Sequence, residues 1–241
     1  MKKSVNELGQ PVGELVENWK APPAPVRVVI PGVYCSLVPL DSEAHSSQLF
    51  EAFCQDGAGA NWTYLPYGPF SAAADFHAWV SEQSEKPDPL FFAVVDASSG
   101  SAVGVLSFMR IAQSMGSIEI GHIHFSPQLQ GTVASTEALY LMLEWVFSAG
   151  YRRCEWKCNA LNEASRVAAE RLGFSFEGVF RQAAIVKGRN RDTAWFSMLD
   201  KEWGKLSEAF AAWLAPQNFS SSGRQKLRLS ELTANALAHQ A

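Results

Sequence analysis

The stretch Ser117-Ile118-Glu119-Ile120-Gly121-His122-Ile123-His124-Phe125 decides the fold of this chain, together with residues 126–159. It is predicted to form a strand. In residues 137–147 the apolar side chains recur at helix spacing, and Gly150 then provides a C-terminal stop. Residues 153–159 alternate as a second strand does. A strand–helix–strand crossover joins parallel strands, so we expect a parallel pair around an intervening helix.

The residues before this unit predict a strand, two helices and an antiparallel meander. A strand is expected at residues 34–38, and a helix at residues 41–53 with Asp41 as its N-cap. A second helix is expected at residues 71–82, after an aromatic loop at residues 61–70. Three strands with short connections follow, and such connections join antiparallel neighbours. These strands are expected at residues 90–95, 102–109 and 117–125.

The residues after the unit add a helix, a hairpin and a last helix. Asn162 is the predicted N-cap of a helix that ends before Gly173. Strands are expected at residues 174–186 and 193–199, with Arg189 and Arg191 as solvated charges of the turn between them. A last amphipathic helix is expected at about residues 201–214. The whole order predicts an α/β fold with a mixed, mostly antiparallel twisted sheet.

One domain is expected at residues 34–214, with an extension at each end. Residues 1–33 contain five prolines, which disfavour both helix and sheet, so we expect an N-terminal arm that packs on the domain. Residues 215–241 are expected to form a polar C-terminal extension. Either extension offers a surface for a homodimer.

Composition describes an ordinary globular protein. Of 241 residues, 47% are hydrophobic and 18% are charged, and a net charge of -4 argues against nucleic acid as a partner. The most apolar helical stretch, residues 138–147, is too short to span a bilayer, and no signal peptide is recognised. The four cysteines form no Cys-x-x-Cys pair, which is typical of free thiols in a reducing compartment. We therefore expect a cytoplasmic protein without a membrane partner.

The turn at residues 126–136 is a candidate ligand site because it joins a strand to a helix. Free backbone N–H groups and the helix dipole at such a turn attract phosphate groups. Several residues of the turn are small, so that a ligand can approach the backbone closely. Every strand-to-helix turn offers these groups, however, and spacing alone leaves a purely structural turn equally open.

Three ordered motifs resemble the GNAT superfamily of acyl-CoA N-acyltransferases, in its RimJ/RimL-like branch. They are the turn followed by Thr136-Glu137-Ala138, then Asn162-Glu163-Ala164-Ser165 with Leu172-Gly173-Phe174 and Glu177-Gly178, and then Arg189-Asn190-Arg191-Asp192. The resemblance covers about residues 34–200. It implies a GNAT-type sheet with helices on both faces, in which the parallel strands splay apart around acetyl-CoA. It also implies acetyl transfer from acetyl-CoA to a primary amine, without a metal.

The resemblance assigns the contacts of acetyl-CoA to the strand, the turn and the next helix start. The expected contacts are Ile123, Phe125, Gln130, Gly131, Thr132, Val133, Ala134, Ser135, Thr136 and Asn162. The family's loop usually reads Gln/Arg-x-x-Gly-x-Gly/Ala. One register of this pattern puts Val133 in place of the central glycine. A register that starts at Gln128 keeps Gly131 and puts Val133 last.

The reaction requires a proton acceptor and a proton donor, because an ammonium group cannot attack a thioester. Glu119 matches a base position of the superfamily, and His122 is the other candidate. A bulge at Gly121 would bring Glu119 onto the face that carries the histidines. Ser165 is the expected acid, since Ala169 stands where many relatives have a tyrosine. Each of these side chains also has a plain structural interpretation in a sheet or helix cap.

The acceptor amine is expected to contact the aromatic loop and the strand. The expected contacts are Trp62, Tyr64, Tyr67 and His124, although the aromatic side chains would serve equally as core residues. His122-x-His124 has no clear third ligand, so a metal site is not expected. The most favoured acceptor is a protein N-terminal α-amine. The alternatives are a small amine (antibiotic, polyamine or aminoacyl conjugate) or a non-catalytic CoA-binding protein.

Overall fold

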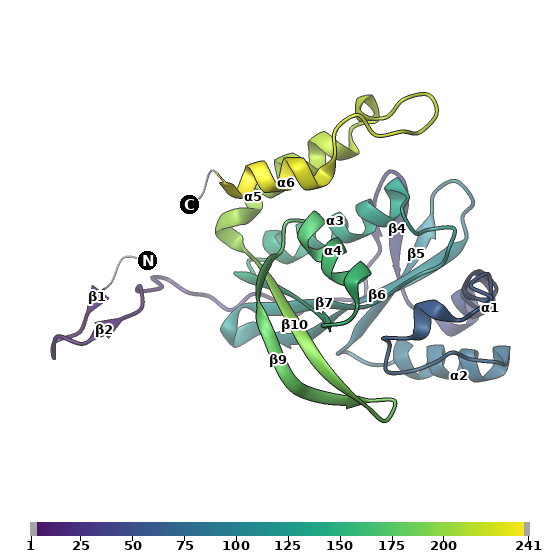
Figure 1. Cartoon of the computed structure of the whole chain (residues 1–241), viewed down its shortest axis with the longest axis horizontal. Helices are drawn as coiled ribbons and strands as arrows, with labels where there is room; N and C mark the ends of the chain where they lie inside the picture. Colours follow the sequence, from purple (N-terminus) through teal and green to yellow (C-terminus); the bar gives the residue numbers. More distant parts are fainter. Residues whose placement is uncertain (1–3, 239–241) are drawn as a thin grey trace.

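A computed structural model describes residues 4–238 and contains an eight-stranded mixed sheet (Figure 1). All neighbouring strands are antiparallel except β7 and β8, which are parallel. In spatial order the strands are β3 (Ile30–Pro31), β4 (Cys35–Pro39), β5 (Leu90–Asp96), β6 (Ala102–Ala112), β7 (Ser117–Phe125), β8 (Arg153–Asn159), β10 (Arg189–Leu199) and β9 (Ser175–Val186). The predicted fold class, including its one parallel pair, is confirmed.

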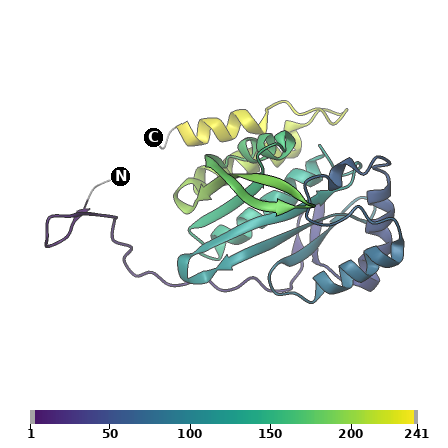
Figure 2. The same cartoon turned by 60° about the horizontal axis from the view of Figure 1, so that its bottom comes forward.

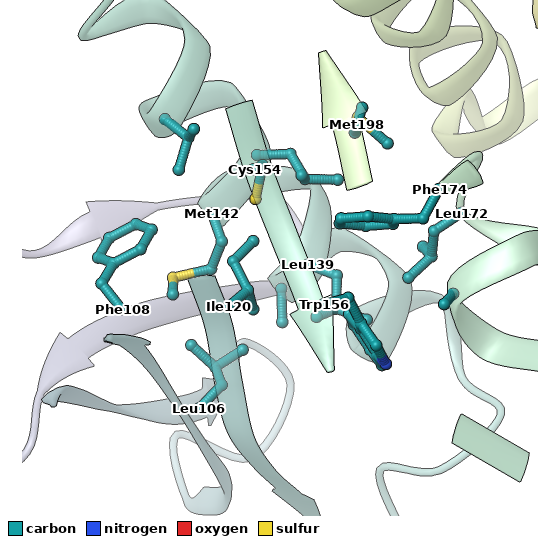
Figure 3. Close-up of a cluster of buried hydrophobic side chains, with 14 of the residues drawn as sticks. Leu106, Phe108, Ile120, Leu139, Met142, Cys154, Trp156, Leu172, Phe174 and Met198 are labelled. Carbon is teal, nitrogen blue, oxygen red and sulfur yellow. The ribbon is translucent and has the colours of Figure 1, made fainter. Parts of the chain in front are cut away.

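Helices cover both faces of this sheet, and each face has its own core. The helices are α1 (Ser42–Cys54), α2 (Ala73–Ser84), α3 (Val133–Ser148), α4 (Glu163–Arg171), α5 (Asp200–Leu214) and α6 (Leu229–Ala238). The smaller core joins α1 and α2 to the sheet. The larger core joins α3, α5 and residues of β6, β7 and β8, among them Phe108, Ile120 and Trp156 (Figure 3). Strand alternation explains the division, because Phe91 faces the first core and Phe92 the second.

Side-chain caps fix where α1 and α3 begin. Asp41 accepts a hydrogen bond from the amide of Ala44 (2.8 Å) and caps α1, as predicted. Thr132 caps α3 by accepting from the amide of Ser135 (3.1 Å), so α3 begins at Val133, earlier than the predicted start near residue 137. A threonine cap among small residues carries little apolar periodicity, which is why the pattern located this helix start too late.

The hairpin of β9 and β10 is longer than the sequence predicts. A turn was expected at residues 187–192, but β10 already begins at Arg189. Lys187 and Gly188 both have positive φ angles, 49° and 72°. Two such residues make the tight turn whose twist matches that of the flanking strands. Residues 189–192 therefore extend the strand instead of forming a loop.

A buried carboxylate fastens the start of the domain to α3. Glu137, which is 4% exposed, accepts hydrogen bonds from three consecutive backbone amides. These are the amides of Val33 (2.9 Å), Tyr34 (2.6 Å) and Cys35 (2.8 Å). A Cβ on Gly32 would lie 2.6 Å from Glu137 Oε2, so the close approach requires glycine at this position.

The N-terminal arm has two parts. Its outer part, with the hairpin of β1 (Ser4–Val5) and β2 (Pro11–Val12), projects away from the domain (Figures 1 and 2). Its inner part follows the body, where the Tyr151 hydroxyl donates to the carbonyl of Pro23 (3.0 Å). At the C-terminal end, α6 packs on α5 and buries Leu229. The predicted extensions include residues 1–3 and 239–241, which lie outside the described residues.

Candidate active site

The strands β7 and β8 pair only at their first residues and then diverge. The paired positions are Ser117 with Arg153, Ile118 with Cys154, and Glu119 with Glu155. β7 nevertheless has nine residues and β8 has seven. Both strands thus continue beyond the last pair without bonding each other within the described chain. This divergence leaves backbone groups of both strands available to a ligand.

A bulge in β7 begins where the divergence begins. Gly121 pairs with Ser107 on β6, but the next pair is His124 with Val105, so β7 carries one extra residue. His122 has a φ angle of 50° at this point. The bulge was predicted at Gly121 and lies one residue further on. Because of it, both Glu119 and the two histidines face the α1 and α2 side of the sheet.

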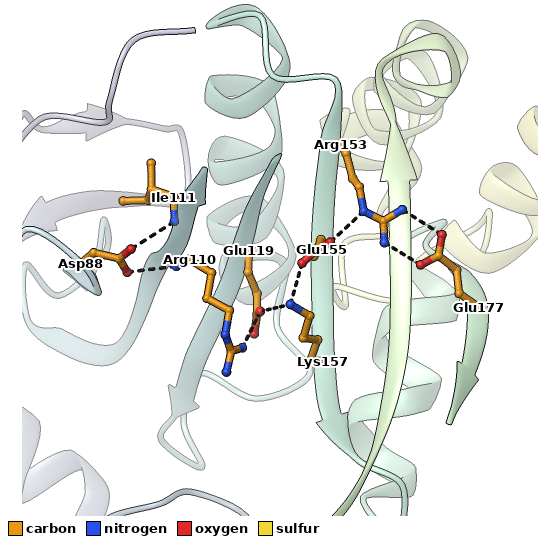
Figure 4. A network of polar contacts seen from close by, with 8 residues as sticks. All are labelled: Asp88, Arg110, Ile111, Glu119, Arg153, Glu155, Lys157 and Glu177. Atoms are coloured by element: carbon orange, nitrogen blue, oxygen red, sulfur yellow. Dashed lines mark hydrogen bonds and ion pairs between the residues drawn. The ribbon is translucent and has the colours of Figure 1, made fainter. Parts of the chain in front are cut away.

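Glu119 lies at the centre of a charged network on this face (Figure 4). The carboxylate is 3% exposed and pairs with Arg110 (2.7 Å) and with the Nζ of Lys157 (2.9 Å). Lys157 also binds Glu155 at 2.6 Å, and Glu155 in turn binds Arg153. Two cations, from β6 and β8, therefore share the charge of Glu119.

His122 is a neutral imidazole beside the network. Burial, reinforced by the positive charge of Arg110 and Arg191, lowers the pKa of His122 to about 4. Its Nδ1 shares a hydrogen bond of 3.2 Å with the hydroxyl of Tyr67. Burial also raises the pKa of Tyr67, so that the phenol keeps its proton. Near neutral pH the pair thus offers an unprotonated imidazole held in place by a phenol.

His124 lies deeper, among aromatic rings. Its ring stacks on Phe53 at 3.9 Å and meets the edge of Trp62 at 3.9 Å. It is 2% exposed, neither ring nitrogen has a hydrogen-bond partner among the described residues, and burial lowers its pKa to about 4. Trp62 is equally buried, at 5% exposure. These two predicted acceptor contacts sit in the smaller core, and their contact with an acceptor stays a prediction.

Ser165 faces the diverging end of β8. Its amide is capped by Asn162 (3.2 Å), as predicted, and its hydroxyl accepts a hydrogen bond from Trp156 Nε1 (3.0 Å). Burial raises the pKa of the Cys158 thiol, and a hydrogen bond from Ser165 partly offsets this rise. Ala169, at the position of the missing tyrosine, is fully buried in the larger core. Ser165 is thus a hydroxyl already placed between an indole and a sulfur.

The turn before α3 contains a left-handed glycine and leads into the first amides of the helix. Gly131 has a φ angle of 72°, which favours glycine at this position. The amides of Val133 and Ala134 open the first turn of α3, where no intrahelical acceptor exists. Other predicted contacts have partners already. Ser135 donates its amide to Thr132, Gln130 binds the Phe125 carbonyl, and Thr136 accepts from Arg171.

The aromatic loop contacts two segments beside it, the residues after β8 and the turn between β9 and β10. The hydroxyl of Tyr64 donates to the carbonyl of Leu161 (3.1 Å), just after β8. Lys187, in the β9–β10 turn, donates to the carbonyl of Trp62 (2.8 Å). The loop therefore bridges the segment after β8 and the tip of the hairpin, and it restricts the approach to the bulge from that side.

Sequence reasoning missed three cations of the site. Lys157 and Arg110 lie on opposite sides of Glu119, and the alternation of charged residues in β8 was a signal for Lys157. Arg191, expected as a solvated charge, is half-buried with an Nε that lacks a hydrogen-bond partner in the described chain. Its charge acts on His122 and Glu119. No signal in the turn sequence distinguished Arg191 from Arg189.

Residues 4–238 bear on two further kinds of site, a metal centre and a membrane span. In this range no cluster of three or more His, Cys, Asp or Glu side chains is arranged to hold a metal ion. None of its helices combines the length and the apolar character needed to cross a bilayer.

Known proteins resemble this chain both in sequence and in structure. A GCN5-related N-acetyltransferase from Brucella melitensis is 47% identical, with a TM-score of 0.89 over 91% of this chain and 100% of that one. An acetyltransferase of Chromobacterium violaceum ATCC 12472, assigned to the GNAT family, is 43% identical, with a TM-score of 0.76 over 81% and 98%.

A curated relative is YdaF of Bacillus subtilis (strain 168), named as a candidate ribosomal N-acetyltransferase. It is 30% identical over 105 residues, which is 43% of this chain, and the match spans 57% of its own length. The acetyltransferase (GNAT) domain family matches residues 36–175, more than half of the sequence, and the chain therefore belongs to the GNAT acetyltransferases.

Proposed function

We propose that this chain transfers an acetyl group from acetyl-CoA to the α-amine of a protein N-terminus. The observation that carries the proposal is the junction of β7 and β8, where the pairing ends at Glu119 and the bulge begins at His122. A pantetheine chain bound there would find unpaired strand backbone on both sides. Acetyl-CoA serves as the acetyl donor, and the proposed reaction needs no resident cofactor.

The turn before α3 is the proposed pyrophosphate site. The left-handed Gly131 and the first amides of α3 present N–H groups at the positive end of the helix dipole. The divergent strands lead from this turn toward the bulge. Ile123, Phe125 and Asn162 remain the predicted contacts along that path.

The chemistry at the bulge follows from the amine. Its nitrogen lone pair attacks the thioester carbonyl, the carbon–sulfur bond then breaks, and the nitrogen loses a proton while the CoA thiolate gains one. Glu119 and His122 are the proposed acceptors of the amine proton, through water. Ser165 is the proposed donor to the sulfur, because its hydroxyl lies beside the diverging end of β8 and is held there by a hydrogen bond from Trp156 Nε1.

The weakness of His122 as a base favours an α-amine as acceptor. The pKa of His122 is about 4, so its imidazole is a weak base. An α-amine has a pKa of about 8 and a lysine side chain about 10.4, so the α-amine is far more often neutral at pH 7. The name of YdaF supports a protein acceptor as well.

A small-molecule amine is the second candidate, and the bridged aromatic loop favours it. The Tyr64 hydroxyl hydrogen-bonds the segment after β8, and the carbonyl of Trp62 accepts from the β9–β10 turn. These contacts narrow the access of a folded polypeptide to the bulge in β7. A small amine passes such a barrier more easily than a protein N-terminus.

The proposal is tested by measuring CoA release from acetyl-CoA with matched acceptors. The panel contains peptides with a free α-amine, the same peptides with a blocked N-terminus and an internal lysine, and small amines. We expect turnover with free α-amines and little with the blocked peptides. Preferential turnover of small amines would establish the second candidate instead. Failure of the chain to bind acetyl-CoA by calorimetry would reject both.

A further inference from the structure

The outer N-terminal arm has no partner among the other described residues of its own chain. It projects from the domain in both views (Figures 1 and 2) and exposes Val5 (66%), Leu8 (82%) and Leu15 (82%). A two-stranded hairpin with exposed apolar side chains is at best marginally stable in water. The arm is rooted at Trp19, which packs against Gly116 and the guanidinium of Arg152. The residues before this root therefore need a surface that their own domain does not supply.

The strand β9 is an open edge of the sheet. It pairs with β10 on one side and is the last strand in the order, so its other side is unpaired in the described chain. It has twelve residues, and the exposed side chains include Phe176 (48%), Phe180 (56%) and Ile185 (81%). A long, apolar, unpaired edge strand invites pairing with another strand. The β9 edge and the outer arm thus both expose apolar side chains that are able to cover each other.

The charges of the two surfaces are opposite. Residues 4–19 contain three glutamates, Glu7, Glu14 and Glu17, and no lysine or arginine. β9, the turn after it and the first residue of β10 (residues 175–189) contain three exposed cations against one acidic residue, Glu177. These cations are Arg181, Lys187 and Arg189. Attraction between the segments favours their contact and fixes which surfaces meet.

We propose that the outer arm of one copy docks along β9 of a second copy, and that the exchange is reciprocal. Each chain then supplies one arm and one β9 edge, which closes a symmetric dimer. The dimer would lie beside the site, because Phe180 of β9 is 4.5 Å from Trp195, whose ring lies 3.9 Å from the Nζ of Lys157. The inference does not depend on the identity of the acceptor amine.

Oligomeric state is the first test, by light scattering on the full chain at increasing concentration. We expect a dimer for the natural sequence and a monomer for the double variant Leu8→Glu and Leu15→Glu. Both leucines are exposed and far from either core, so circular dichroism of the variant should be unchanged. Leu227→Glu, at another exposed leucine (49%), is the matched control and should remain dimeric. A monomeric natural chain, or a dimeric double variant, would overturn the proposal.

Cross-linking identifies the surface. The exposed Cys54 is first replaced by serine, since the other three cysteines are buried. A chain with Leu8→Cys and one affinity tag is then mixed with a chain that has Ile185→Cys and a different tag. Mild oxidation should yield a disulfide between the two tags, and Leu227→Cys in place of Ile185→Cys should not. A single chain with both Leu8→Cys and Ile185→Cys that cross-links only to itself would show that the arm folds onto its own edge, and would reject the exchange.

Discussion

Glu137 and Glu119 are both buried carboxylates, but they bind different kinds of partner. Glu137, 4% exposed, accepts from three backbone amides at the start of β4. Glu119, 3% exposed, is bound by two side-chain cations beside the divergence of β7 and β8. Backbone donors cannot swing away, whereas an arginine side chain that is 57% exposed can. Burial is nearly equal at the two sites, and the difference lies in the partners, which are fixed backbone amides for Glu137 and side-chain cations for Glu119.

The largest effect is expected from removing the first carboxylate. Glu137→Ala leaves three amides without an acceptor in the core, and each such loss costs about 1–3 kcal/mol. We expect the free energy of unfolding, measured in urea, to fall by about 4 kcal/mol. The turnover of the folded fraction should persist. Glu144→Ala on the same helix is the control, with a loss of about 0.5 kcal/mol. Equal losses in the two variants would show that the amide contacts are not structural.

Removing the second carboxylate should harm activity more than stability. Glu119→Gln is expected to lower kcat about 100-fold, or about 2.7 kcal/mol in activation free energy. The free energy of unfolding should fall by about 2 kcal/mol, because the buried Lys157 loses one carboxylate but keeps Glu155 as a partner, and Arg110 can turn to solvent. Glu155→Gln is the matched control, and it should retain turnover within a few-fold. Identical rates for the two variants would remove Glu119 from the proposed chemistry.

A steric change separates the role of Glu137 from its charge. Gly32→Ala would place a Cβ 2.6 Å from both Glu137 Oε2 and the carbonyl oxygen of Cys35. We expect a loss of about 2 kcal/mol in unfolding free energy, since the amide contacts must shift. Gly13→Ala has open space around it and should change stability by less than about 0.5 kcal/mol. An unchanged free energy of unfolding for Gly32→Ala would mean that the contacts between Glu137 and the start of β4 adjust without cost.

A third buried polar group sharpens the comparison because it has no partner. Replacing His124 by phenylalanine keeps the stacking on Phe53 and removes two unpaired nitrogens. We expect the unfolding free energy at pH 7 to rise by about 1 kcal/mol. The lowered pKa of His124 also means that the folded state disfavours its charged form, so stability falls as pH drops from about 6.5 toward 4. His124→Phe should lose part of this fall, and an unchanged pH profile would contradict it.

Local pattern predicted the fold well, because its rules act within short segments. The alternation in β8 and the caps at Asp41 and Asn162 were all readable. Thr132 was missed as a cap because small residues surround it, and the early start of β10 was missed because charged residues resemble a loop.

The candidate site depended on contacts that no short segment contains. Glu119 and Lys157 meet because the parallel register pairs Glu119 with Glu155, and the crossover sets that register. His124 lies in a core because Phe53 and Trp62 arrive from distant segments. A strand pattern shows which face a residue takes, but it does not show what covers that face.

The hydrogen bonds between Glu137 and the start of β4 also have a consequence for folding during synthesis on the ribosome. The carboxylate lies 102 to 104 positions after the amides that it holds. Translation at about 5–20 residues per second separates their emergence by roughly 5–20 s. During that interval the first strand of the nascent domain has no anchor in α3. The start of β4 therefore lacks its hydrogen-bond acceptor from the synthesis of Cys35 until that of Glu137. During this interval a chaperone that shields the segment would have its largest effect.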